Sequence, residues 1–214
     1  MRTHRLLGWA LIATLLVGAA HAAPLTRAQA LAALNGVEAS TRLTGIDRLA
    51  EIGTMSDANR LFDRLRDGDP QVRQLSSLAL WRIWSRSGDP AIDRLFANGV
   101  EQMSAAAFDD ALATFNEIVR RKPTFAEGWN KRATLYFMLG QFQKSLLDCD
   151  EVLKRNPLHF GALSGAGQIH LQLGNLRSAL EYFRRAVDAN PNMDGPAQMI
   201  PLLEERLRDD PNRT

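Results

Sequence analysis

Apolar residues between Ile92 and Met193 recur at spacings of three and four, the period of helices that bury one face. The whole pattern returns after 34 residues, without insertion or deletion. Each unit closes on a proline, at Pro123, Pro157 and Pro191. Other equivalent positions share a size class: Leu95, Trp129 and Leu163; Phe108, Phe142 and Leu176; Ala111, Ser145 and Ala179; Leu112, Leu146 and Leu180; Phe115, Cys149 and Phe183. The pattern predicts three consecutive units, 92–125, 126–159 and 160–193.

A break near the middle of each unit divides it into two helices. Ala106, Gly140 and Gly174 share this position, and glycine suits the left-handed residue that ends a helix. The closing proline lacks an N–H group and cannot continue the second helix. Because one helix pair cannot bury its apolar face alone, neighbouring pairs are expected to stack.

The aligned positions of the three units resemble the tetratricopeptide repeat (TPR) family, whose pattern places Trp, Leu-Gly, Tyr, Ala, Phe and Pro at fixed offsets. The middle unit matches at Trp129, Tyr136 and Pro157, with Arg132 and Ala133 in place of Leu-Gly, and Ser145 and Cys149 in place of Ala and Phe. The outer units supply Gly99, Ala111, Phe115 and Pro123, and Gly167, Ala179, Phe183 and Pro191. The resemblance implies an all-α, right-handed superhelical stack of helix-turn-helix repeats.

Helical segments are also predicted on both sides of the repeats. In residues 24–88, Asp69-Pro70 is an N-cap signal, as is Asp89-Pro90 just beyond. Residues 71–85 are apolar on several faces, so this helix is expected between the repeats and the helices before it. Residues 194–210 read as a capping helix that turns Leu202, Leu203 and Leu207 toward the stack.

The N-terminal segment carries a weaker internal repeat. An offset of 31 aligns Arg42 with Arg73, Gly45 with Ser76, Leu49 with Leu80 and Ile52 with Ile83. The segment resembles a short HEAT-type repeat, and an irregular helical cap on the repeat array is the alternative.

The first 22 residues are typical of a cleaved signal peptide. Arg2 and Arg5 precede an apolar run from Leu6 to Ala20, which is shorter than the roughly 20 residues of a spanning helix. Small residues then favour cleavage after Ala22. A permanent membrane anchor is the alternative. Export predicts a periplasmic location in a bacterium and no stable membrane insertion after cleavage.

Charge and cysteine content narrow the classes of function. Of 26 Lys and Arg residues, two lie in the leader, so the mature chain would balance its 24 acidic residues. The basic pI of the precursor therefore gives no reason to expect nucleic-acid binding. The single Cys149 cannot form an internal disulfide, so the fold depends on its apolar core.

The sequence carries no phosphate loop, His-Glu-x-x-His, paired-Cys spacing or nucleophile elbow, so no metal or cofactor is expected. Cys149 and His170 fall on helices expected to pack together, but both occupy core positions of the repeat. His159 is expected exposed in a turn. The carboxylates Asp109, Asp110, Asp148, Asp150 and Glu151 are expected on a solvated face, and Trp81, Trp84 and Trp129 in the core.

The resemblance implies a concave groove lined by the first helix of each unit, which in the family binds a peptide. The lining carried over is Asp93, Phe96, Val100 and Met103; Glu127, Asn130, Lys131, Thr134 and Phe137; and Ser164, Gln168 and Leu171. Some of these could instead meet the N-terminal helices or the end cap. Asn130 and Lys131 match a carboxylate clamp found in some members, whose remaining residues are lacking here.

We therefore predict a non-enzymatic, exported scaffold that binds a partner protein or peptide. An accessory subunit of an envelope enzyme, a Cys/His-dependent enzyme and a self-associating structural protein are the alternatives. The partner and the oligomeric state are left open by the sequence.

Overall fold

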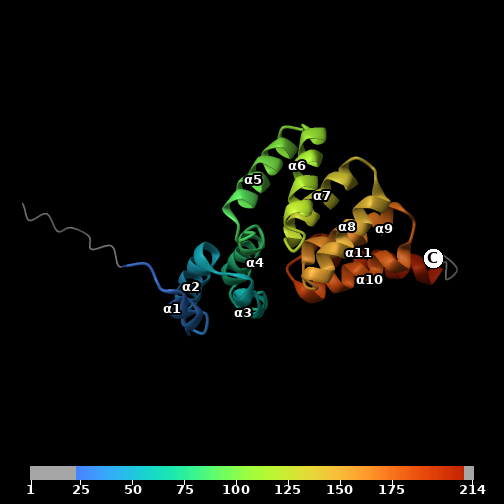
Figure 1. Cartoon of the computed structure of the whole chain (residues 1–214). Coiled ribbons are helices and arrows are strands. Elements are labelled where there is room, and N and C mark those ends of the chain that lie inside the picture. The colour runs from blue at the N-terminus through green and yellow to red at the C-terminus, as the bar shows by residue number, and fades with distance from the viewer. Residues whose placement is uncertain (1–22, 210–214) are drawn as a thin grey trace, which may run out of the picture.

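The computed structural model describes residues 23–209, and the predicted leader with its cleavage site lies outside the described residues. Every regular element in this range is helical (Figure 1). The elements are α1 (Arg27–Ala33), α2 (Ala39–Ile52), η1 (Met55–Asp57), α3 (Ala58–Arg64), α4 (Pro70–Trp84), α5 (Pro90–Ser104), α6 (Phe108–Arg121), α7 (Ala126–Met138), α8 (Phe142–Arg155), α9 (Phe160–Gln172), α10 (Leu176–Ala189) and α11 (Asp194–Asp209). No helix among the described residues is long and apolar enough to cross a membrane.

Helices α5 to α10 form three consecutive pairs, α5–α6, α7–α8 and α9–α10, and α11 packs on α10. The predicted left-handed break recurs in each pair, with φ of 56° at Ala106, 69° at Gly140 and 78° at Gly174. The prediction of an all-α stack of helix-turn-helix repeats is therefore confirmed.

Close packing of a phenylalanine against a glycine joins the two helices of the first and third units. A Cβ added at Gly99 would lie 2.8 Å from Cζ of Phe115, and one at Gly167 would lie 2.7 Å from Cδ1 of Phe183. Both rings are completely buried. Only a residue without a side chain leaves room for the ring at these two positions.

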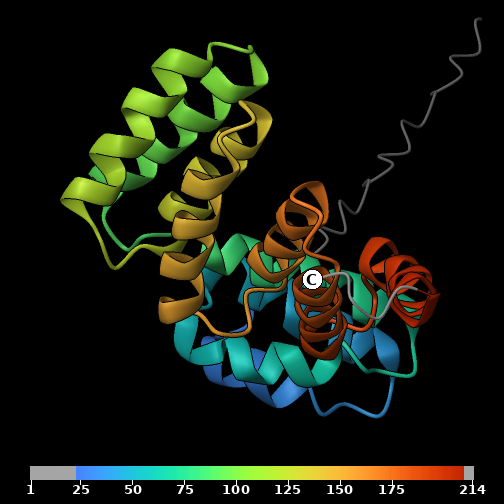
Figure 2. The same cartoon turned by 90° about the vertical axis from the view of Figure 1, so that its right-hand side faces the viewer.

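The N-terminal helices lie against the edge of the stack where the repeat units are joined (Figures 1 and 2). Leu80 of α4 shares one buried cluster with Phe160 of α9 and Ala186 of α10. The turn after α10 is tied down as well, because the Asn192 side chain donates a 2.8 Å hydrogen bond to the Leu65 carbonyl. Helix α4 is thus enclosed on several sides, as its apolar pattern predicts.

Helix α4 begins as its sequence predicts. The Asp69 carboxylate accepts hydrogen bonds from the N–H groups of Gln71 and Val72, and Pro70 occupies the first helical position. Asp89 and Pro90 start α5 in the same way.

The internal repeat of the N-terminal segment corresponds to a repeated contact. The Arg42 guanidinium donates to the carbonyls of Gly36 and Val37, at 2.9 and 2.7 Å. Arg73, 31 positions later, donates to the carbonyls of Asp67 and Gly68, at 2.9 and 3.2 Å. In both copies an arginine therefore closes the turn that precedes its own helix. The HEAT-like relationship stays a prediction.

Three expectations about exposure are wrong for residues outside the candidate site described below. Leu202 and Leu203 both belong to α11. Leu203 is buried, but Leu202 is 53% exposed because it lies on the side of the helix that faces solvent. Asp148 is buried rather than solvated. Trp129 is only half-buried, with its ring between the guanidinium groups of Arg132 and Arg155, each 4.9 Å from the ring centre.

Asp148 is buried because it is neutralised by a neighbouring helix. The Arg132 guanidinium donates two hydrogen bonds of 2.7 Å to the Asp148 carboxylate, which joins α7 to α8. A third bond of 2.8 Å reaches the side chain of Asn116 on α6. This paired geometry is the one in which a buried carboxylate is tolerated.

Candidate functional site

A pocket of about 230 Å³ lies between α7 and α9, on the side formed by the first helices of the middle and third units. Five residues predicted to line the groove contribute to it: Asn130, Thr134, Phe137, Ser164 and Gln168. The remaining lining consists of Ala133, Ser145, Cys149, Gly161, Ala162, Gly165 and Ile169. The pocket walls are therefore mostly small or apolar, with hydroxyl and amide groups among them.

The pocket exists because the middle unit departs from the repeat. Where the outer units pair a glycine with a phenylalanine, this unit pairs Ala133 with Cys149. The alanine methyl occupies space that a phenyl ring would need, and the thiol is much smaller than the ring. A ring-sized volume is thus missing between α7 and α9, where Ala133 and Cys149 line the pocket.

Two glycines of α9 line the same space. Gly165 lies within the helix, and a Cβ added there would meet nothing within 4 Å. Gly161 differs, because a Cβ there would come within 2.3 Å of the Trp81 ring of α4. Packing therefore requires glycine at position 161 but not at position 165, where glycine costs the helix about 1 kcal/mol relative to alanine.

Hydrogen bonds fix the polar part of the wall. The Ser145 hydroxyl donates a 2.7 Å bond to the Ala133 carbonyl, and the Thr134 hydroxyl donates a 2.9 Å bond to the Asn130 carbonyl. The Asn130 amide donates to the Glu127 carboxylate at 3.0 Å. Gln168, in contrast, is exposed at the rim. The pocket is thus preformed, and its free polar groups lie at its edge.

The other predicted groove residues lie elsewhere. Phe96 is buried, and its ring contacts the rings of Phe115 and Phe125, with centroids 6.2 and 5.3 Å away. Val100 and Met103 pack partly buried against the same first-unit core. Leu171 packs against the α10–α11 core, which the end cap completes. The candidate site is therefore narrower than the groove predicted from all three units.

A buried hydrogen bond between His159 and Glu127 lies beneath this site. Nε2 of His159 is 2.9 Å from the Glu127 carboxylate, and both side chains are completely buried. The expectation that His159 is exposed is wrong, because Nδ1 accepts a hydrogen bond from the Ala162 N–H and caps α9. Since Nδ1 accepts, the N–H that faces Glu127 is the one on Nε2, which donates to the carboxylate. The Trp84 ring of α4 stacks on the imidazole at 4.4 Å.

The Glu127 carboxylate stays charged in this environment. Burial alone would raise the pKa of Glu127, but the hydrogen bond from His159 and the charge of Lys131 hold it below its usual value. The Lys131 ammonium lies 3.5 Å from this carboxylate. Glu127, which was expected to line the groove like its equivalent Asp93, instead joins the start of α7 to the start of α9 through His159. The sequence signal for this contact was His159, a histidine directly before the third unit, where it can cap α9.

The Cys149 and His170 side chains do not form a catalytic pair of the usual kind. Burial raises the pKa of the Cys149 thiol to about 12, so the thiolate is scarce at neutral pH. The His170 ring stacks instead on Tyr182, with ring centroids 5.3 Å apart. The arrangement suits a small core residue at Cys149 rather than a nucleophile.

Comparisons with known proteins agree with this architecture. A family model described as Tetratricopeptide repeat matches residues 130–194. A TPR repeat-containing protein of Rhizobium etli is 33% identical over 150 residues, covering 70% of this chain and 74% of that protein.

Two solved structures share the fold at 20% identity. The first TPR of Spaghetti (RPAP3), bound to the HSP90 peptide SRMEEVD, has a TM-score of 0.53 over 55% of this chain and 93% of that one. The MamA protein has a TM-score of 0.52 over 73% of this chain and 87% of its own. With three helix pairs in register and a relative matched over most of both chains, the protein belongs to the tetratricopeptide repeat family.

Proposed function

We propose that this protein is a non-catalytic adaptor that holds a peptide segment of a partner protein in the α7–α9 pocket. TPR proteins act as protein-interaction adaptors. The observation that carries the proposal is the ring-sized space left by Ala133 and Cys149, which opens among the predicted groove residues. Peptide recognition by the similar RPAP3 domain supports it by analogy of fold.

The pocket chemistry favours one apolar side chain as the anchor of that peptide. Its volume of about 230 Å³ is smaller than the roughly 300–1,000 Å³ typical of small-molecule sites. Apolar walls from Phe137, Ile169 and Ala133 would surround the anchor. Ser164 and Gln168 at the rim would meet the peptide backbone around it.

We also propose that the adaptor works in the bacterial cell envelope. The support is the leader pattern of residues 1–22: a basic start, a short apolar run and small residues before Ala23. Expression of the full chain followed by N-terminal sequencing of the envelope fraction tests this. A product that begins at Ala23 supports export, and an uncleaved cytoplasmic product excludes it.

The adaptor function is tested by filling the pocket from its own wall. Gly165→Leu places a side chain into the open space, and Gly195→Leu on α11 is the matched control. A Cβ at either glycine would meet nothing within 4 Å, and both lie in helices. Both variants should keep their helicity.

In vivo crosslinking followed by mass spectrometry would compare the two variants with the wild type. We expect Gly165→Leu to lose the crosslinked partner while Gly195→Leu retains it. An identical partner list for both variants would exclude this pocket as the binding site.

A further inference from the structure

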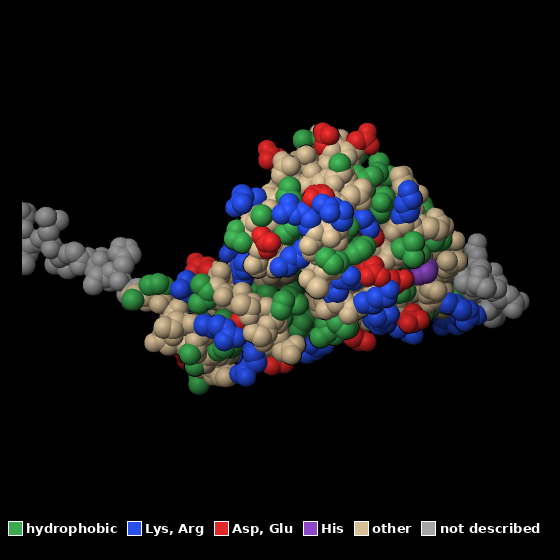
Figure 3. Space-filling view, in the orientation of Figure 1, with side chains coloured by type: hydrophobic (Ala, Val, Ile, Leu, Met, Phe, Trp, Pro, Cys, Tyr) green, Lys and Arg blue, Asp and Glu red, His purple; other side chains and the backbone are tan. Residues whose placement is uncertain are grey.

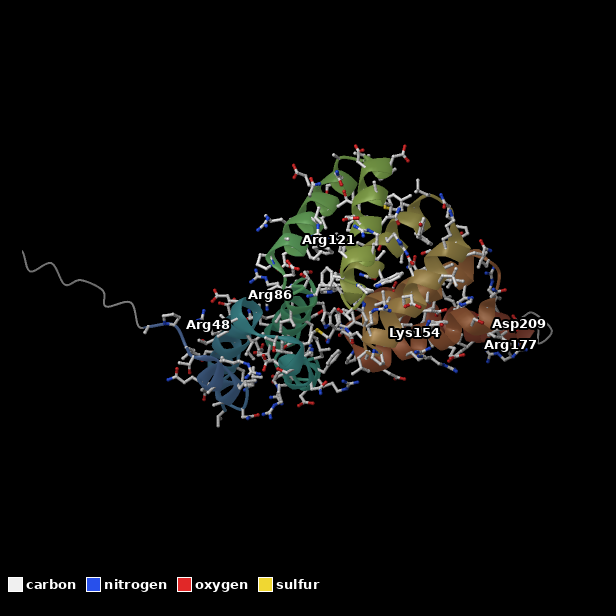
Figure 4. The ribbon with its side chains drawn as sticks, in the orientation of Figure 1. Arg48, Arg86, Arg121, Lys154, Arg177 and Asp209 are labelled. Carbon is white, nitrogen blue, oxygen red and sulfur yellow. The ribbon has the colours of Figure 1, made fainter. Side chains whose placement is uncertain are left out.

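A second pocket, of about 260 Å³, lies where the N-terminal helices meet the first two repeat units. Its walls come from the end of α4, the turn between α6 and α7, and the end of α8. The residues important here are Trp84, Arg86, Lys122, Thr124, Arg155 and Asn156. Figure 3 shows Lys and Arg side chains on the face where the α5–α6 pair meets the N-terminal helices, and Figure 4 labels Arg86 there.

The pocket wall is positively charged. Three cationic side chains line it, and no Asp or Glu of the described chain does so. Arg86 donates only to backbone carbonyls, those of Ala50 and Gly53, at 2.7 and 2.6 Å. Lys122 forms no ion pair within residues 23–209, whereas Arg155 is paired with Glu151 at 2.6 Å. Two positive charges are therefore left without a contacting carboxylate.

Two acidic residues at the start of α5, Asp89 and Asp93, accept hydrogen bonds from backbone N–H groups. The Asp93 carboxylate accepts a 2.7 Å hydrogen bond from the Ser87 N–H. Asp89 caps α5 through the Ala91 N–H at 2.8 Å. Asp93 attracts Arg86, and Asp89 attracts Lys122, only through electrostatic interactions at longer range.

Two buried donors of the same wall have no partner. Nε1 of Trp84 and Nδ2 of Asn156 make no hydrogen bond with any described residue. Trp84 is 4% exposed and Asn156 is 7% exposed. A buried donor without an acceptor costs roughly 1–3 kcal/mol, so two at one pocket call for an acceptor that the chain itself does not supply.

The start of α7 adds further donors at this point. Its N-cap is Phe125, which provides no capping side chain, whereas the equivalent His159 caps α9. The first N–H groups of a helix attract anions, and those of α7 begin beside Thr124 and Phe125 in the pocket wall.

We propose that this pocket binds a small oxyanion, a phosphate or a carboxylate group, held by Lys122, Arg86 and the start of α7, with Trp84 and Asn156 as inner donors. The pocket is distinct from the α7–α9 pocket and does not depend on the proposed adaptor function. An anion here would join α4 to the first two repeat units and so stabilise the junction.

The test is a titration of the ¹⁵N-labelled full chain at constant ionic strength, with sodium chloride as the balancing salt. One arm uses inorganic phosphate and the other uses succinate, and the Trp84 indole N–H resonance reports binding. Lys122→Gln removes a pocket charge, and Lys154→Gln is the matched control, because Lys154 is an exposed lysine of α8 outside the pocket.

We expect saturable shifts, with Lys122→Gln weakening binding about tenfold and Lys154→Gln less than twofold. Saturation by phosphate alone identifies a phosphate site, by succinate alone a carboxylate site, and by both a general oxyanion site. The proposal is overturned if neither anion saturates beyond the chloride effect, or if both lysine variants weaken binding equally. Gly165→Leu should leave the anion affinity unchanged, which separates this test from that of the adaptor pocket.

Discussion

Restoring the glycine–phenylalanine pair of the outer units should fill the α7–α9 pocket without loss of stability. The change is the double variant Ala133→Gly/Cys149→Phe. In the outer units the ring lies so close to glycine that an added Cβ would be 2.7 to 2.8 Å from it. A phenylalanine at position 149 should therefore collide with the methyl group of Ala133 and fit only when that methyl group is removed.

The two single variants show how large the change in the free energy of unfolding should be. Cys149→Phe alone overfills the space beside Ala133 and should cost about 1–3 kcal/mol. Ala133→Gly alone should cost about 2 kcal/mol, because it adds a helical glycine and removes a buried methyl group. In the double variant, burial of the ring is worth about 1.5–3 kcal/mol and offsets the glycine. Since the double variant should be about as stable as the wild type, the two changes should be coupled by about 3–5 kcal/mol.

The assay is urea unfolding of the wild type, both single variants and the double variant, followed by circular dichroism at 222 nm. We expect a midpoint close to that of the wild type for the double variant, and lower midpoints by roughly 0.5–2 M for the singles. The double variant should also lose the crosslinked partner. Additive losses of stability, with the double variant the least stable, would refute the argument that the pocket is a vacated ring site.

Three further changes test other contacts. Arg132→Ala should cost about 3–5 kcal/mol in urea unfolding because it leaves Asp148 charged and buried, and a loss below 1 kcal/mol would contradict the proposed role of this ion pair. Because the folded-state pKa of Glu127 is lowered, its contribution is complete above the unfolded value of about 4.3 and falls as pH decreases further. The wild type should therefore exceed Glu127→Gln in stability at pH 7 and lose that advantage progressively as the pH falls below about 4.3, whereas a constant difference would contradict the charged state. Ala106→Gly should raise stability by about 0.5–1 kcal/mol in thermal unfolding, since it relieves the positive φ of 56°, and a decrease would show that this turn is unstrained.

Much of the repeat architecture could be predicted because it depends on local chemistry. Periodic apolar residues, the glycines at positions 140 and 174, and the Asp-Pro caps each act through neighbours within a few residues. The aligned column of Phe115, Cys149 and Phe183 also revealed that the middle unit lacks a ring. Whether neighbouring side chains close that space is a question of packing, which no local pattern answers.

The exposure of individual polar residues could not be predicted in this way. His159 and Asp148 look like solvated residues in the sequence, yet each is buried because a charged partner from another helix compensates the loss of water. Phe96 matches a groove position, but Phe115 and Phe125 enclose its ring. These outcomes depend on side chains 16 to 32 positions away.

The sequence alone thus determined the three helix pairs, their turns and the position of the missing ring, because hydrophobic periodicity and backbone preference act along the chain. The tertiary structure alone decided which charges are buried, that α4 lies across the joints of the units, and that two pockets stay open. Those features depend on how completely helices that are distant in the sequence fill the space between them and neutralise each other's charge.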